Sequence, residues 1–101
     1  MPQPLIWLPD AVDDLARLRQ FIAEHSQASA DRAARRIQEG VRILMELPEA
    51  GKPLEDEELT EFRDLVVPFG SGAYVLRYRL DKGSIIMVRV WHSREGERKK
   101  P

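Results

Sequence analysis

Two consecutive segments near the C-terminus, residues 72–81 (GAYVLRYRLD) and residues 84–93 (SIIMVRVWHS), decide the fold of this chain. Each alternates apolar and polar side chains with a period of two, which is typical of a strand with one buried face. Only Lys82 and Gly83 connect them. A link this short permits only a hairpin turn, and glycine readily adopts the positive φ that such a turn requires. The sequence therefore predicts an antiparallel hairpin.

The alternation also predicts what each face of the hairpin carries. One face collects the core-type residues Tyr74, Leu76, Tyr78, Leu80, Ile86, Val88, Val90 and His92. The opposite face holds Arg77, Arg79, Arg89 and Trp91. Three arginines beside an exposed tryptophan are typical of a binding surface for an anionic partner. Ion pairs to an acidic loop, or solvation, would also account for the arginines.

Length and composition bound the protein class. At 101 residues the chain is expected to form one domain over residues 1–101. It has no cysteine and two histidines, so we expect no disulfide, no metal and no cofactor. No apolar run approaches the ~20 residues of a membrane-spanning helix, and no signal-peptide pattern is visible. We therefore expect a cytoplasmic protein without a membrane partner.

The charge is unevenly distributed along the chain. The net charge is −1, yet residues 49–61 are strongly acidic and residues 62–101 are basic. We expect the acidic segment 49–61 to be a flexible loop and residues 95–101 to be a polar tail. A basic C-terminal segment attracts nucleic acid or acidic protein segments.

The first half of the chain predicts two helices. Residues 5–8 read as a short strand ended by Pro9, with Asp10 as the helix N-cap. Apolar residues then recur at helical spacing over residues 11–25 and again from residue 29 or 30 to residue 47. Gly40 in the second helix would be explained by a close approach of the two helices.

A third long strand is predicted at residues 62–67, where Pro68 would end it. The element order is then β-α-α-β-β-β, in which the helix hairpin packs on one face of a small, mainly antiparallel sheet. The fold class is α+β. We expect four aromatic residues in the core: Trp7, Phe21, Tyr74 and Tyr78.

Several short stretches resemble the RelE/ParE superfamily of bacterial toxins from toxin–antitoxin modules. The matching residues are Trp7, Ala11, Ala33, Ile37, Leu44, Leu47, Pro48, Gly51 and the stretches 62–65 (FRDL), 72–79 (GAYVLRYR) and 88–94 (VRVWHSR). The resemblance covers nearly the whole chain. It implies an antitoxin partner whose acidic or amphipathic C-terminal segment wraps the toxin, and it implies growth arrest or plasmid stabilisation as the role.

The resemblance leaves two activities open. The RelE-like branch cleaves messenger RNA on the ribosome without metal. Its C-terminal tyrosine falls at Lys100, its strand arginine near Gly70, and only Lys52 could replace its lysines. A second nuclease pattern in the superfamily uses Glu, Arg and a His-Tyr pair, and Ser93 stands in place of that tyrosine. If the chain were a nuclease, the catalytic candidates would be His92, Arg94 and Arg63.

The ParE-like branch, which poisons DNA gyrase, matches better. Its Tyr-x-Leu-x-Tyr-Arg and Arg-Val-x-His-x-Arg patterns are present at residues 74–79 and 89–94. The favoured interpretation is a gyrase-inhibiting toxin without chemistry of its own. A messenger RNA endonuclease and an inactive, antitoxin-binding relic are the alternatives. The expected antitoxin- or target-binding residues are Arg63, Arg77, Arg79, Arg89, Trp91 and Arg94.

Overall fold

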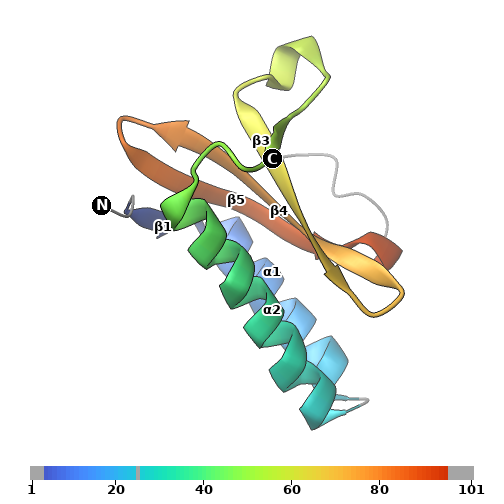
Figure 1. Cartoon of the computed structure of the whole chain (residues 1–101). Coiled ribbons are helices and arrows are strands. Elements are labelled where there is room, and N and C mark those ends of the chain that lie inside the picture. Colours follow the sequence, from blue (N-terminus) through green and yellow to red (C-terminus); the bar gives the residue numbers. More distant parts are fainter. Residues whose placement is uncertain (1–3, 25, 96–101) are drawn as a thin grey trace.

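The computed structural model describes residues 4–24 and 26–95 of the chain. Two helices, α1 (Pro9–Ala23) and α2 (Gln27–Glu46), lie on one side of a five-stranded sheet (Figure 1). The strands are β1 (Leu5–Trp7), β2 (Lys52–Pro53), β3 (Phe62–Phe69), β4 (Gly72–Asp81) and β5 (Ser84–His92). Two short 3-10 turns, η1 (Glu57–Leu59) and η2 (Ser93–Glu95), complete the fold.

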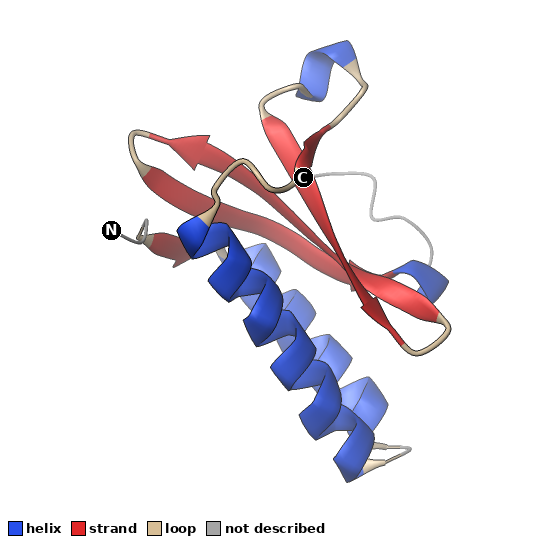
Figure 2. Ribbon diagram, viewed as in Figure 1, coloured by secondary structure: helices blue, strands red, loops and turns tan. Residues whose placement is uncertain are grey.

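The strand order across the sheet is β1-β5-β4-β3-β2. β1 pairs with β5 in parallel, and every other pair is antiparallel. The expected α+β fold is confirmed, and Figure 2 shows both helices covering the same face of the sheet. The two-residue strand β2 was not predicted, because its only sheet contacts are with Arg63 and Asp64 of β3. The segment predicted to be a loop, residues 49–61, contains β2 and η1. Of the predicted tail at residues 95–101, only Glu95 lies within the described residues.

The two helices begin earlier than the sequence predicted. Leu8, not Asp10, is the N-cap of α1, and Pro9 occupies the first turn, where its missing N–H costs no hydrogen bond. α2 begins at Gln27 because the Ser26 hydroxyl accepts a hydrogen bond of 3.1 Å from the backbone N–H of Ser29. α1 ends at Ala23, two residues before the predicted end at His25, which itself lies outside the described residues.

Gly40 marks a close approach of α2 to the sheet. A Cβ atom at this position would lie 2.8 Å from both Leu76 Cδ1 and Val67 Cγ2. The prediction that Gly40 brings the two helices together is therefore wrong, since the neighbours that exclude a side chain belong to β3 and β4.

The predicted hairpin between β4 and β5 is confirmed. Asp81 pairs with Ser84, and the two turn residues Lys82 and Gly83 have φ values of 48° and 82°. Positive φ at both positions is the geometry of a tight two-residue turn that matches the twist of the strands.

A β-bulge at Val88 changes which residues of β5 face the core. Arg77 pairs with Arg89, whereas the next residue, Tyr78, pairs with Met87. Val88 is therefore extra, and the alternation of side chains shifts by one at this point. The prediction that Ile86 and Val88 share a face with Val90 is wrong. The core residues of β5 are Ile85, Met87 and Val90.

The prediction that Pro68 ends the third long strand is wrong. Pro68 lies inside β3, which continues to Phe69. At this end β3 has no neighbouring strand on its outer side within the described part of the chain, because β2 pairs only with Arg63 and Asp64. Proline is tolerated on such an edge because no ladder hydrogen bond is lost. Arg36 Nε of α2 donates a hydrogen bond of 3.0 Å to the Pro68 carbonyl oxygen.

The core lies between the helices and the sheet. It contains Tyr74, Leu76 and Tyr78 of β4, the three core residues of β5, and from the helices Ala11, Leu18, Ala33, Ile37 and Leu44. The prediction is confirmed for Tyr74 and Tyr78, and Trp7 is partly buried against the core. It is wrong for Phe21, a residue that is 60% exposed, because Leu18 and Ile22 occupy the core-facing stripe of α1.

Candidate functional site: the open face of the sheet

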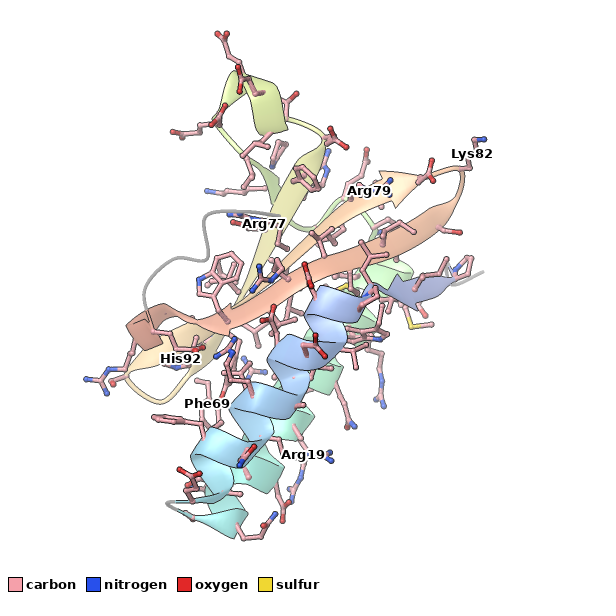
Figure 3. All side chains as sticks on the ribbon, turned by 180° about the vertical axis from the view of Figure 1, so that it is seen from behind. Arg19, Phe69, Arg77, Arg79, Lys82 and His92 are labelled. Carbon is pink, nitrogen blue, oxygen red and sulfur yellow. The ribbon has the colours of Figure 1, made fainter. Side chains whose placement is uncertain are left out.

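We call the sheet face that the helices leave uncovered the open face. By register its members include Phe62, Asp64 and Val66 of β3, Val75, Arg77 and Arg79 of β4, and Ile86, Val88, Arg89 and Trp91 of β5. Figure 3 shows Arg77 and Arg79 on the side of the sheet away from the helices. This face carries four of the six binding residues predicted from the sequence.

Arg77 lies at the centre of the open face and is only 2% exposed. Its Nε and Nη2 atoms donate hydrogen bonds of 2.8 and 3.0 Å to the two carboxylate oxygens of Asp64. The guanidinium carbon lies 4.9 Å from the centre of the Trp91 ring, a cation–π contact. Trp91 is itself 4% exposed. The prediction that both residues are exposed is therefore wrong, since each covers the other.

Arg89 is held by a carboxylate from α1. Its Nε and Nη2 atoms donate to Asp14 Oδ2 at 2.8 Å and Asp14 Oδ1 at 3.1 Å. This hydrogen bond raises the pKa of Arg89 further. Burial alone would raise the pKa of Asp14, but hydrogen bonds from Arg89, the Val90 N–H and Arg17 outweigh burial and lower it. Both groups therefore stay charged at neutral pH.

Asp14 also closes the edge of β5 beyond β1. Its Oδ2 atom accepts the backbone N–H of Val90 at 2.9 Å, and Arg17 donates to the Val90 carbonyl oxygen at 3.4 Å. Glu95 accepts the N–H of His92 at 2.8 Å and pairs with Arg17. Side chains thus take the place of a neighbouring strand, which protects the edge from pairing with another chain.

Sequence reasoning missed Asp14, although one signal was present. Asp14 is a carboxylate within the apolar stripe of the first helix, between Ala11 and Leu18 at helical spacing. A charge in that position must find a partner when it is buried. The partner could not be read from the sequence because Arg89 lies 75 positions further along the chain.

Arg63 lies apart from the other arginines. It pairs with Tyr78 and faces the helix side of the sheet. Its Nη1 atom donates to the carbonyl oxygens of Gly51 at 2.8 Å and Glu49 at 3.2 Å. Arg63 also forms an ion pair with Glu49 of the acidic loop, at 4.0 Å.

Arg79 is the more accessible arginine of the open face. Its side chain is 32% exposed, and its ion pair with Asp81 is long, at 3.8 Å. It lines a pocket at the start of α1 together with Phe62 and Val88. Arg94, in η2, is exposed.

Both ring nitrogens of His92 lie near backbone groups. Nδ1 accepts the N–H of Arg94 at 3.2 Å, and Nε2 lies 3.4 Å from the Phe69 carbonyl oxygen. The ring packs edge-on against Tyr74, with centroids 4.9 Å apart. A Cβ atom on Gly72 would lie 2.7 Å from His92 Cε1. His92 is thus a packed residue at the end of β5.

Of the three nuclease candidates, His92 and Arg94 are neighbours at the end of β5, whereas Arg63 lies apart from them. His92 lies opposite Tyr74 and Arg63 lies opposite Tyr78. Four residues along a strand span about 13 Å at ~3.3 Å per residue. Within residues 4–24 and 26–95, no three His, Cys, Asp or Glu side chains are arranged to hold a metal ion. Neither helix in the described part of the chain has the length and apolar content that a membrane crossing requires.

Comparison with known protein families identifies the family of this chain. A family model described as "ParE toxin of type II toxin-antitoxin system, parDE" matches residues 5–96. The chain belongs to the ParE toxin family. It is a toxin of the ParE/RelE superfamily of type II toxin–antitoxin systems, which confirms the resemblance inferred from the sequence.

Relatives of this ParE-family chain include three toxins of Caulobacter vibrioides. Toxin RelE1 is 32% identical over 82 residues, covering 81% of this chain and 84% of the relative. Toxin RelE2 is 34% identical over 89 residues, covering 88% and 93%. Toxin RelE3 is 31% identical over 87 residues, covering 86% and 90%.

Two solved structures share the fold. A chain of the chromosomal ParDE system from P. aeruginosa superposes with a TM-score of 0.72 at 22% identity, covering 89% of this chain and 95% of that chain. A chain of the RelBE2 toxin–antitoxin complex from Mycobacterium tuberculosis gives 0.60 at 24% identity, covering 91% and 99%. The predicted α+β architecture, observed as two helices packed on a five-stranded mixed sheet, is thus that of ParE and RelE toxins.

Proposed function

We propose that this chain is a ParE-like toxin that inhibits DNA gyrase by binding it, without catalysing a reaction. The observation that carries the proposal is the state of the open face. Its two central arginines are neutralised by aspartates, and the described residues offer no acid–base pair beside them.

Metal-free RNA cleavage requires specific catalytic groups. The reaction needs a base for the 2′-OH proton, an acid for the leaving oxygen and cations for the developing charge. His92 is engaged through both ring nitrogens. Burial raises the pKa of Tyr74 and of Tyr78, so both phenols stay protonated. Arg77 and Arg89 already donate hydrogen bonds to Asp64 and Asp14, respectively.

We further propose that a cognate antitoxin neutralises the chain in the cytoplasm. The structural neighbours belong to ParDE and RelBE systems, which supports a partner of this kind. Arg79 and Arg94 are the predicted binding residues best placed to contact an acidic segment. Arg77, Arg89 and Trp91 would shape the surface beneath it, and Arg63 would act through the loop it holds.

A gyrase supercoiling assay tests the proposal. Purified protein is titrated into gyrase and relaxed plasmid with ATP, and the cleavage complex is resolved on a gel. We expect loss of supercoiling and accumulation of broken DNA, reversed by the antitoxin encoded beside the toxin gene. Unchanged supercoiling at micromolar toxin would reject gyrase as the target. Heat-unfolded protein at the same concentration is the control.

A ribosome-dependent messenger RNA endonuclease is the second candidate, because the curated relatives are named RelE. In that case His92→Gln should remove message cleavage on translating ribosomes while leaving antitoxin binding unchanged. If expression of the toxin harms neither DNA nor messages, the inactive-relic alternative is favoured over both.

A further inference from the structure

A pocket of about 390 Å³ opens where β4 and β5 pass the start of α1. It is lined by Leu8, Pro9, Asp10, Phe62, Arg79 and Val88. Its volume lies in the ~300–1,000 Å³ range of small-ligand pockets. Four of its six side chains are apolar, and one, Arg79, is cationic.

The bulge in β5 creates the apolar wall of this pocket. With regular alternation Val88 would face the core beside Val90 and Tyr78. The extra residue instead turns Val88 to the open face, where it is 5% exposed. Since bulges often re-aim a side chain at a functional position, the placement of Val88 beside Arg79 identifies this pocket as more than a surface irregularity.

Charge decides which ligand fits. Arg77 and Arg89 each donate two hydrogen bonds of normal length to an aspartate. Among the described residues Arg79 has one ion pair, the 3.8 Å contact with Asp81 at the exposed end of the strand. Its guanidinium therefore retains donors for a carboxylate, with which it can form a two-point contact.

Asp10 on the opposite rim does not cancel this preference. Its charge contributes to raising the pKa of Arg89, so Asp10 lies within electrostatic reach of that arginine as well. Among the described contacts no ion pair joins Asp10 to Arg79, whose one ion pair is with Asp81. Asp10 instead limits where a ligand carboxylate can sit, because like charges repel.

We propose that this pocket is an anchor site for the antitoxin, where an aliphatic side chain packs against Phe62 and Val88 while an adjacent carboxylate binds Arg79. This inference rests on the antitoxin partner proposed above. It does not depend on whether gyrase or the ribosome is the target. It assigns one accessible arginine a specific role within a face whose other strand arginines are internally neutralised.

A small probe tests the site in the whole protein. 4-Methylpentanoate carries an isobutyl tail and a carboxylate, and its neutral match is 4-methylpentanamide. The probes are titrated into ¹⁵N-labelled toxin while backbone NMR shifts are followed. For a ligand of about eight non-hydrogen atoms, half-saturation is expected in the millimolar range. Shifts should centre on residues 8–10, 79 and 88, and the amide should bind at least about tenfold more weakly.

Four variants separate the contributions. Arg79→Met should abolish binding of the acid, and Arg79→Lys should restore part of it. Asp10→Asn should strengthen binding by about two- to fivefold. The matched control is Arg42→Met, since Arg42 is an exposed arginine on α2, and it should change nothing. Equal binding of acid and amide, retained binding in Arg79→Met, or no shift at tens of millimolar would each overturn the anchor site.

Competition identifies the occupant. One equivalent of the antitoxin encoded beside the toxin gene should displace the probe completely. If the probe binds as described but the antitoxin leaves it in place, the assignment to the antitoxin is wrong. A toxin that fails to inhibit gyrase but passes both tests would reject the gyrase target while supporting the anchor site.

Discussion

Arg77 and Arg89 lie directly opposite each other on β4 and β5, yet each is neutralised from its own side. Asp64, the register partner of Arg77 on β3, holds one, and Asp14 of α1 holds the other. Like charges in cross-strand positions destabilise a sheet. The two aspartates offset this repulsion. Asp64, Arg77, Arg89 and Asp14 form a row of charges, negative at both ends and positive in the middle, that connects α1 with three strands.

Replacing Asp14 should loosen this row. Asp14→Asn keeps the size of the side chain but removes the charge that holds Arg89 and Arg17. We expect the free energy of unfolding to fall by about 3 kcal/mol at pH 7, because the largely buried Arg89 loses its ion pair with the Asp14 carboxylate. Urea unfolding followed by circular dichroism measures this. The neighbouring exposed residue gives the control, Asp13→Asn, which should cost less than about 0.5 kcal/mol.

Acidification should remove the contribution of the Asp14 carboxylate to the free energy of unfolding. The folded state lowers the pKa of Asp14, so the unfolded chain binds its proton more readily. The stabilisation is therefore complete above the ordinary aspartate pKa of about 3.9 and is lost as pH falls through the folded value. The stability difference between the wild type and Asp14→Asn should narrow as the pH falls below about 4. A difference independent of pH would show that the charge of Asp14 contributes nothing.

Arg77 should matter for stability and Arg79 should not. Arg77→Met leaves the Asp64 carboxylate without its two hydrogen bonds and removes the stacking on Trp91. We expect a loss of about 2–4 kcal/mol, partly recovered in the double variant Asp64→Asn/Arg77→Met. Arg79→Met, on the same strand but accessible, should change the free energy of unfolding by less than about 0.5 kcal/mol. Equal losses for the two arginines would contradict the buried row.

Gly40→Ala should destabilise the protein although alanine favours helices. The helix gains about 1 kcal/mol in propensity, but the new methyl group would lie 2.8 Å from Leu76 and Val67. Both neighbours are buried and can move little, so overpacking should outweigh the gain and leave a net loss of about 1–2 kcal/mol. Thermal unfolding checks the sign. Gln38→Ala, exposed on the same helix, should be neutral or slightly stabilising.

Tyr78→Phe should release the loop between α2 and β2. The Tyr78 hydroxyl donates to the Pro48 carbonyl oxygen at 2.7 Å and accepts the Gly51 N–H at 2.8 Å. Losing both bonds in a buried site should cost about 1–3 kcal/mol and speed hydrogen exchange of the Gly51 amide. The control is Tyr74→Phe, because the Tyr74 hydroxyl forms no hydrogen bond with the described residues. Unchanged exchange at Gly51 in Tyr78→Phe would reject the anchoring role of the hydroxyl.

Local sequence was enough for the helices, the β4–β5 hairpin and the α+β class. Helical and strand periodicity depend on neighbours a few residues apart, and the Lys82-Gly83 turn fixes its own geometry. The same reasoning failed for β2, whose two residues form a strand only because β3 lies beside them. It also failed for Phe21, since an amphipathic pattern does not say how far a helix is rotated towards the sheet.

The sequence by itself determined the order of the two helices and the long strands, the aromatic core of β4 and the concentration of arginines near the C-terminus. The tertiary structure alone decided which of those arginines remain accessible. The bulge at Val88 depends on how β5 matches the twist and register of β4, and the Asp14–Arg89 contact joins residues far apart in the chain. Buried charges must be paired wherever the fold brings them together, so only the folded chain could show that Arg77 and Arg89 are neutralised while Arg79 faces a pocket.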